Sequence, residues 1–71
     1  MEEITIQTEF IKLDSLLKFA SFVGTGGEAK IVIADGLVSV NGEVCLARGK
    51  KIYNGDVVEF DGQKIRVLHE N

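Results

Sequence analysis

Several residue types that are typical of particular classes of protein are missing or rare in this chain. It has no proline and no tryptophan, and its one cysteine is Cys45. A single cysteine cannot form an internal disulfide, and small secreted domains usually depend on such bridges, so we expect a reducing, cytoplasmic compartment. His69 is the one histidine and has no cysteine or histidine near it in the sequence, which argues against a metal site.

Long apolar runs are also missing. The run from Ile31 to Ala34 is far shorter than the roughly 18 residues that a membrane span needs. The start of the chain, Met1-Glu2-Glu3, is acidic and lacks the positive region of a signal peptide. We therefore expect no membrane association. The apolar content of 45% is normal for a soluble globular protein, and 71 residues predict one domain over residues 1–71.

The chain lacks the residue sets of common catalytic and cofactor sites. There is no Ser/His/Asp set, no H-E-x-x-H and no C-x-x-C. The segment 24–30 is rich in glycine, but no Gly-Lys-Ser/Thr closes it, and a predicted helix precedes it instead of a strand. We expect no enzyme activity, no cofactor and no small-molecule substrate. The few aromatic residues, four Phe and one Tyr, are expected mainly in the core, with no surface row for stacking bases.

The charge is unevenly distributed along the chain. The net charge is −3, which argues mildly against nucleic acid, because nucleic-acid-binding modules usually have a positive balance. Residues 12–51, however, contain six basic against four acidic side chains, and both ends of the chain are acidic. Because the local field decides where a polyanion docks, the middle of the chain is the candidate site.

Apolar spacing predicts the first half of the fold. Residues 4–7 alternate apolar and polar side chains, as in a half-buried strand. From Leu13, apolar residues follow the spacing of an amphipathic helix that we expect to end at Gly24. Thr25-x-x-Glu28 has the form of a capping box, in which each side chain accepts a hydrogen bond from the other residue's backbone N–H. A short second helix then ends at Gly36.

Turn signals predict the second half. Asn41-Gly42 separates two short apolar segments and is a strong signal for a two-residue hairpin. Asp61-Gly62-Gln63 predicts a second hairpin, and residues 53–56 a turn between the two. The predicted fold class is α+β, with an N-terminal strand and two short helices, an αα-hairpin, packed on a small antiparallel sheet.

These elements carry motifs that resemble a known family. The motifs are Lys12-Leu13-Asp14-x-x-Leu17, Glu28-Ala29-Lys30, Gly36-x-Val38-x-Val40-Asn41-Gly42 and Gly55-Asp56-x-Val58. In this order, over about residues 11–60, they resemble the ribosomal protein S4-like RNA-binding domain, or αL motif. The Gly26-Gly27 variant with the basic segment 48–51 is most similar to the small stand-alone bacterial YaaA/YbcJ-like group.

The resemblance implies a stand-alone protein that grips structured RNA, with ribosomal RNA and ribosome assembly as its setting. Its implied RNA surface follows the two helices and the strand turn after them. Carried over by position, the implied contact residues are Lys12, Gly26, Gly27, Lys30, Asn41, Arg48, Lys50 and Lys51. We expect the lysines and Arg48 to contact phosphates by charge, and the backbone N–H groups of Gly26 and Gly27 at the helix start to help fix the register of the RNA. We expect the protein to be a monomer.

Two departures from the family predict weaker binding than in a typical member. Thr25-Gly26 stands where many members have Ser-Arg, and Lys12 stands where arginine is common. Lysine lacks the bidentate fork with which arginine binds phosphate.

Simpler interpretations of the same residues stay open. Gly26-Gly27 also suits a tight turn between helices, Asn41 suits a hairpin for backbone reasons, and the basic segment suits a solvated loop. Three functions compete with RNA binding: a protein-interaction module that retains the fold, DNA binding, and a small enzyme or cofactor binder whose support is the glycine turn.

Overall fold

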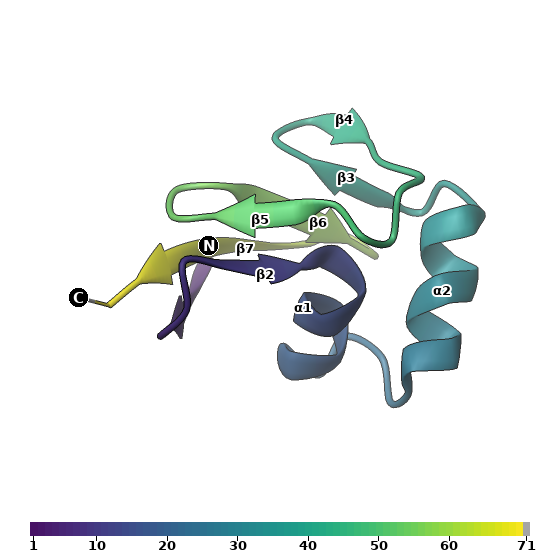
Figure 1. Cartoon of the computed structure of the whole chain (residues 1–71). Helices are drawn as coiled ribbons and strands as arrows, with labels where there is room; N and C mark the ends of the chain where they lie inside the picture. The colour runs from purple at the N-terminus through teal and green to yellow at the C-terminus, as the bar shows by residue number, and fades with distance from the viewer. Residues whose placement is uncertain (71) are drawn as a thin grey trace.

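The computed structural model describes residues 1–70 and contains two helices and seven strands (Figure 1). The helices are α1 (Leu13–Phe19) and α2 (Gly26–Ala34). The strands are β1 (Glu2–Ile6), β2 (Phe10–Lys12), β3 (Val38–Val40), β4 (Glu43–Val44), β5 (Lys51–Tyr53), β6 (Val57–Phe60) and β7 (Gln63–His69). The α+β class and the expected order of helices and hairpins are confirmed.

The main sheet is mixed, which corrects the expectation of a purely antiparallel one. Its strand order is β1-β7-β6-β3-β4. The β3–β4, β3–β6 and β6–β7 pairs are antiparallel, but β1 runs parallel to β7, with Ile4 beside Val67. A tight hairpin turn forces antiparallel pairing, whereas β1 reaches β7 from the other end of the sequence, where no turn fixes its direction.

A second, two-stranded sheet was not predicted at all. Strands β2 and β5 pair antiparallel, with Ile11 beside Ile52. Each strand has only three residues, too few to show an alternating pattern in the sequence. This ribbon leads directly into α1, because β2 ends at Lys12 and the helix begins at Leu13.

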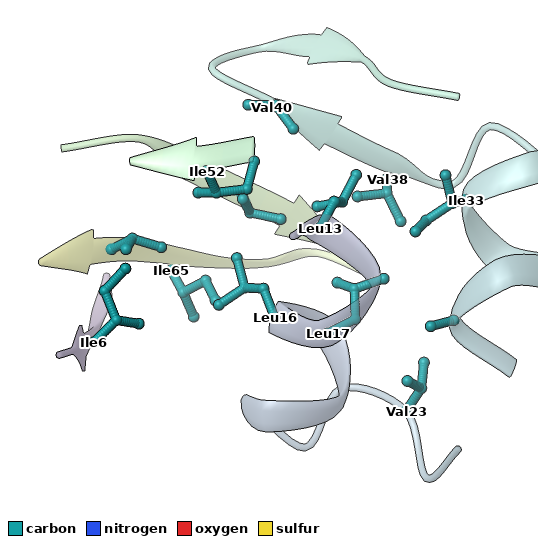
Figure 2. Packing of buried hydrophobic residues seen from close by; sticks show 13 residues of the cluster. Ile6, Leu13, Leu16, Leu17, Val23, Ile33, Val38, Val40, Ile52 and Ile65 are labelled. Atoms are coloured by element: carbon teal, nitrogen blue, oxygen red, sulfur yellow. The ribbon is translucent and has the colours of Figure 1, made fainter. Parts of the chain in front are cut away.

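The core lies between the sheets and the helices. Figure 2 shows Leu13, Leu16 and Leu17 of α1 pointing toward the strands and α2. All three are fully buried, as are Ile52 of β5 and Ile65 of the main sheet (0–1% exposed). The apolar spacing that predicted the first helix therefore corresponds to the side chains on its buried face.

The first helix is shorter than expected. It ends at Phe19, and Ser21 takes the left-handed conformation (φ 61°) that the sequence assigned to Gly24. The N–H groups of Phe22 and Val23 donate to the carbonyl of Leu17, which closes the helix with a tight turn. Val23 lies after that turn and is buried, although it is not part of the helix. Its spacing in the sequence therefore fits the helical pattern only by position.

The second helix has the expected ends with one difference in its capping box. Thr25 Oγ1 accepts from the N–H of Glu28 at 3.1 Å, as predicted. Glu28 Oε1, however, accepts from the N–H of Gly24 at 2.9 Å, one residue before the predicted donor. Gly36, at φ 77°, follows the last turn as expected.

The predicted turns form with left-handed residues at their centres. Asn41 (φ 51°) and Gly42 (φ 87°) join β3 to β4, and Asp61 (φ 54°) and Gly62 (φ 77°) join β6 to β7. Positive φ at both central residues gives the twist that matches two paired strands. The second turn has two residues and not three, because Gln63 already pairs with Phe60.

The expectation that most aromatic residues lie in the core is wrong. Phe22 and Phe60 are partly buried against it, but Phe19 is 58% exposed and Tyr53 is 42% exposed. Cys45 lies just after β4 and not within a strand, and it is half-buried against the core.

Candidate nucleic-acid interface

Two of the predicted RNA-binding lysines lie side by side on the β2–β5 ribbon. Lys12 and Lys51 are direct cross-strand partners, and both are exposed. Like charges placed opposite each other repel and destabilise a strand pair. An anion bound between these two lysines would relieve that repulsion.

The rest of the basic segment is held against the start of α1 by its backbone. The N–H of Leu13 donates to the carbonyl of Lys50 at 2.9 Å, and the N–H of Asp14 donates to the carbonyl of Arg48 at 3.1 Å. Lys12, the N-cap residue of α1, makes no side-chain cap bond. The carbonyls of the loop therefore satisfy two N–H groups that every helix start leaves unpaired.

This arrangement brings the main chains of four predicted residues close together at the start of α1. Arg48 and Lys50 are exposed, and their main chains contact the helix start that follows Lys12. We call Lys12, Arg48, Lys50 and Lys51 the basic cluster. They lie up to 39 residues apart in the sequence, and they come together because the loop caps the helix and β5 pairs with β2.

The glycine turn lies elsewhere. Gly26 and Gly27 begin α2, and Figure 1 shows the connection between the helices at the opposite end of α2 from the loop that enters β5. Nine helical residues separate the two ends, a length of about 13 Å. Lys30 is exposed one turn into α2. The structure therefore divides seven of the eight predicted residues into the basic cluster and a second group, Gly26, Gly27 and Lys30, while Asn41 lies in the turn between β3 and β4.

The charge at the glycine turn is less favourable to an anion than the sequence suggested. The Glu28 carboxylate accepts from the Gly24 N–H, which places a negative charge at the first turn of α2. A carboxylate there already interacts with the positive end of the helix dipole. Space is not the obstacle, because a Cβ built on Gly26 would meet nothing within 4 Å.

Asn41 uses its side chain to hold the strand turns together. Its Nδ2 donates to Asp56 Oδ1 at 3.0 Å, and its Oδ1 accepts from the N–H of Val57 at 2.9 Å. Asp56 Oδ2 in turn accepts from the N–H of Tyr53 at 2.8 Å. These bonds supply a structural reason for asparagine at position 41, and its contact with RNA stays a prediction.

Two aromatic residues beside the basic cluster were missed as part of the site. Phe10 and Tyr53 are cross-strand partners on the ribbon, with ring centroids 5.8 Å apart. The ammonium of Lys51 lies 4.9 Å from the centroid of the Phe10 ring. The signal was present as Phe10-x-Lys12 and Lys51-x-Tyr53, two short segments with the same spacing, which only strand pairing makes neighbours.

Other kinds of site find little support in residues 1–70. Within this range no group of three or more His, Cys, Asp or Glu side chains could hold a metal ion. Nor does either helix have the length and apolar character needed to cross a membrane. The arrangement that stands out is an exposed group of cations around two aromatic rings.

Comparisons with known proteins point to the same family as the sequence motifs. A model of the S4 domain matches residues 4–68. The chain is 46% identical over 59 residues to a Bacillus subtilis (strain 168) protein named probable ribosome maturation protein RlbA, a match that covers 83% of each chain. It is also 38% identical over 58 residues to YbcJ of Escherichia coli (strain K12), covering 82% of this chain and 83% of YbcJ.

Solved structures agree. The solution structure of YbcJ from E. coli, described as having an αL motif involved in RNA binding, has a TM-score of 0.73 at 33% identity and covers 96% of this chain and 87% of that one. The 30S ribosomal protein S4e from Thermoplasma acidophilum has a TM-score of 0.74 at 25% identity, over 90% of this chain and 34% of that one. With its fold, its motifs and almost its whole length matched, the chain belongs to the S4 domain family.

Proposed function

We propose that this protein binds structured RNA through the basic cluster, in the cytoplasm and as a monomer. The observation that supports the proposal is the capping of α1 by the carbonyls of Arg48 and Lys50, which brings the main chains of four exposed basic residues close together. Proteins bind duplex RNA by its shape and by phosphate and 2′-hydroxyl contacts, for which fixed cations suffice. The loop is fixed because its backbone is part of a helix end.

The target that we propose is ribosomal RNA. Support comes from the relatives, which are named as a ribosome maturation protein and a ribosomal protein. The net charge of −3 does not oppose this, because the acidic residues concentrate at the two ends of the sequence and the basic cluster belongs to its middle. Binding should be weaker than that of an arginine-rich member, since three of the four cluster residues are lysines.

The glycine turn is a second proposed contact. Gly26 and Gly27 offer backbone N–H groups, and Lys30 offers a charge, about one helix length from the basic cluster. An RNA helix that touches both groups would be held at two points, which fixes its orientation. We propose a lesser role for Asn41, whose amide already bonds Asp56 and Val57.

The test is a matched pair of charge reversals. Lys50→Glu with Lys51→Glu should weaken binding to ribosomal RNA fragments about tenfold or more in fluorescence anisotropy, because two phosphate contacts become repulsions. The control is Lys64→Glu with Arg66→Glu, which makes the same change in net charge. These residues alternate with buried Ile65 and Val67 and so point away from the core on β7. Equal losses in both variants would show that only total charge matters and would overturn the proposed site.

Competition between RNA and DNA of the same sequence separates the two nucleic acids. RNA should compete at least as strongly as DNA if 2′-hydroxyl contacts contribute.

A protein-interaction function is the second candidate, and one observation favours it. Leu37, Val44 and Leu46 are 55–66% exposed. Gly36 brings them together, since a Cβ built there would lie 3.7 Å from Val44 and 3.9 Å from Leu46. Co-purification of a protein partner that survives nuclease treatment, together with unchanged RNA binding in the Lys50/Lys51 double variant, would favour this function over RNA binding.

A further inference from the structure

The outer face of the β2–β5 ribbon combines aromatic rings with cations. Ile11 and Ile52 point toward the core, Ile52 fully buried and Ile11 packed against the buried cluster. Because side chains alternate along a strand, the residues on either side of them point outward. These outward residues are Phe10, Lys12, Lys51 and Tyr53.

Tyr53 is the accessible ring of this face. It is 42% exposed, while Phe10 is half-buried and lies under the Lys51 ammonium. The two rings are inclined at 48°, so a flat group can stack on Tyr53 and meet Phe10 with its edge. An accessible ring on the same face as two lysines suits a ligand with both an aromatic and an anionic part.

The backbone around Tyr53 is held in place. Its N–H donates to Asp56 Oδ2 at 2.8 Å, and its carbonyl accepts from the N–H of Asp56 at 3.0 Å. Asp56 Oδ1 is bonded to Asn41 in turn. The ring is therefore presented from a braced turn, and both oxygens of the nearest carboxylate already accept hydrogen bonds.

We propose that this face binds one unpaired nucleotide of the RNA, with its base stacked on Tyr53 and its phosphate between Lys12 and Lys51. The inference rests on the proposed function, because the same two lysines belong to the basic cluster. Two strand residues span about 7 Å, so the ring and the lysine pair are neighbours at the scale of a single nucleotide. The preferred RNA is then a helix that carries a bulge or an unpaired end, since a paired base cannot leave its stack without cost.

The sequence supplies a direct probe. Tyr53 is the one tyrosine and the chain has no tryptophan, so intrinsic fluorescence reports on this ring alone. Three RNA hairpins with the same stem are compared: one fully paired, one with a single bulged nucleotide and one with an abasic residue at the bulge. The abasic hairpin keeps the bend and the phosphates but has no base to stack.

The bulged hairpin should quench Tyr53 fluorescence and bind about fivefold or more tightly than the abasic hairpin. The affinity for each hairpin should fall as the salt concentration rises, because phosphate contacts release counterions. The ratio of the affinities for the bulged and abasic hairpins should change little with salt, because stacking releases no counterions. Tyr53→Leu keeps an apolar partner for Phe10 but removes the ring, and it should reduce the ratio to near one. Tyr53→Phe should keep the ratio.

Equal affinities for the bulged and abasic hairpins, with unchanged fluorescence, would overturn the stacking proposal. If the paired stem still binds in a manner that depends on Lys50 and Lys51, the proposed function survives that result. If no hairpin binds, both proposals fail. A preference for the bulge that persists in Tyr53→Leu would also overturn the assignment, because the base would then stack on another part of the protein.

Discussion

The side-chain amide of Asn41 donates a 3.0 Å hydrogen bond to the carboxylate of Asp56, fifteen residues further along the chain. Asn41 forms the turn between β3 and β4, and Asp56 lies in the turn that leads into β6. Their hydrogen bond joins two turns whose sequence motifs, Asn41-Gly42 and Gly55-Asp56, are separate along the chain. The pair explains in physical terms why both motifs occur in one small domain.

We expect Asn41→Gly to destabilise the fold. Glycine keeps the left-handed backbone but loses the bonds to Asp56 and to the Val57 N–H. Two lost hydrogen bonds predict a decrease of about 1–2 kcal/mol in the free energy of unfolding, measured by urea denaturation. Where the variant remains folded, its RNA affinity should stay within twofold. A larger loss of affinity in the folded variant would instead give the amide a larger part in RNA contact than the lesser role proposed for it.

The salt dependence of RNA binding should report the number of phosphates held. If the basic cluster holds about four, the logarithm of affinity should fall against the logarithm of salt concentration with a slope of roughly −3 to −4. Isothermal titrations at several salt concentrations measure it. A flat dependence would rule out binding through phosphates.

Glu28→Gln separates the glycine turn from the basic cluster. Glutamine can still accept from the Gly24 N–H through its side-chain oxygen, but the negative charge at the start of α2 is gone. If a phosphate lies at Gly26 and Gly27, RNA affinity should rise about two- to fivefold, because a nearby repulsion is removed. Glu3→Gln, an exposed change on β1 at the edge of the main sheet opposite β4, serves as the control. An unchanged affinity in Glu28→Gln would remove the glycine turn from the interface.

Leu17→Ala should leave little folded protein. Leu17 is fully buried between α1 and its neighbours, and such a substitution costs about 2–5 kcal/mol. A domain of this size has only a few kcal/mol of stability, so thermal unfolding should begin well below that of the parent. Leu46→Ala, at a side chain that is 66% exposed, should change the melting temperature little. Similar melting curves for the two variants would contradict the assigned core.

Local signals in the sequence predicted the parts of the fold that local chemistry controls. The Thr25 cap, the left-handed Gly36 and the Asn41-Gly42 turn depend on residues within a few positions of one another, and all three form. The family motifs also predicted a set of RNA-contact residues, whose contact with RNA stays a prediction. The grouping of that set was not predicted, because it depends on contacts between distant segments.

Strand pairing between segments far apart in the sequence accounts for the parts of the fold that were not predicted. The parallel pairing of β1 with β7 and the ribbon of β2 with β5 join segments that no turn connects. The exposed ring of Tyr53 was expected in the core for the same reason, since its outward direction follows from the register with Phe10. The left-handed Ser21 after α1 could not be anticipated, because residues other than glycine rarely adopt a positive φ.

The two hydrogen bonds from the start of α1 to the carbonyls of Lys50 and Arg48 limit which sequence changes this loop can tolerate during evolution. They involve main-chain atoms alone, so side chains at these positions can be exchanged without disturbing the helix. Inserting or deleting a residue would shift the carbonyls and uncap it. Among relatives, the number of residues in this loop should therefore be preserved while its chemistry drifts, and a change of RNA target can proceed by single substitutions.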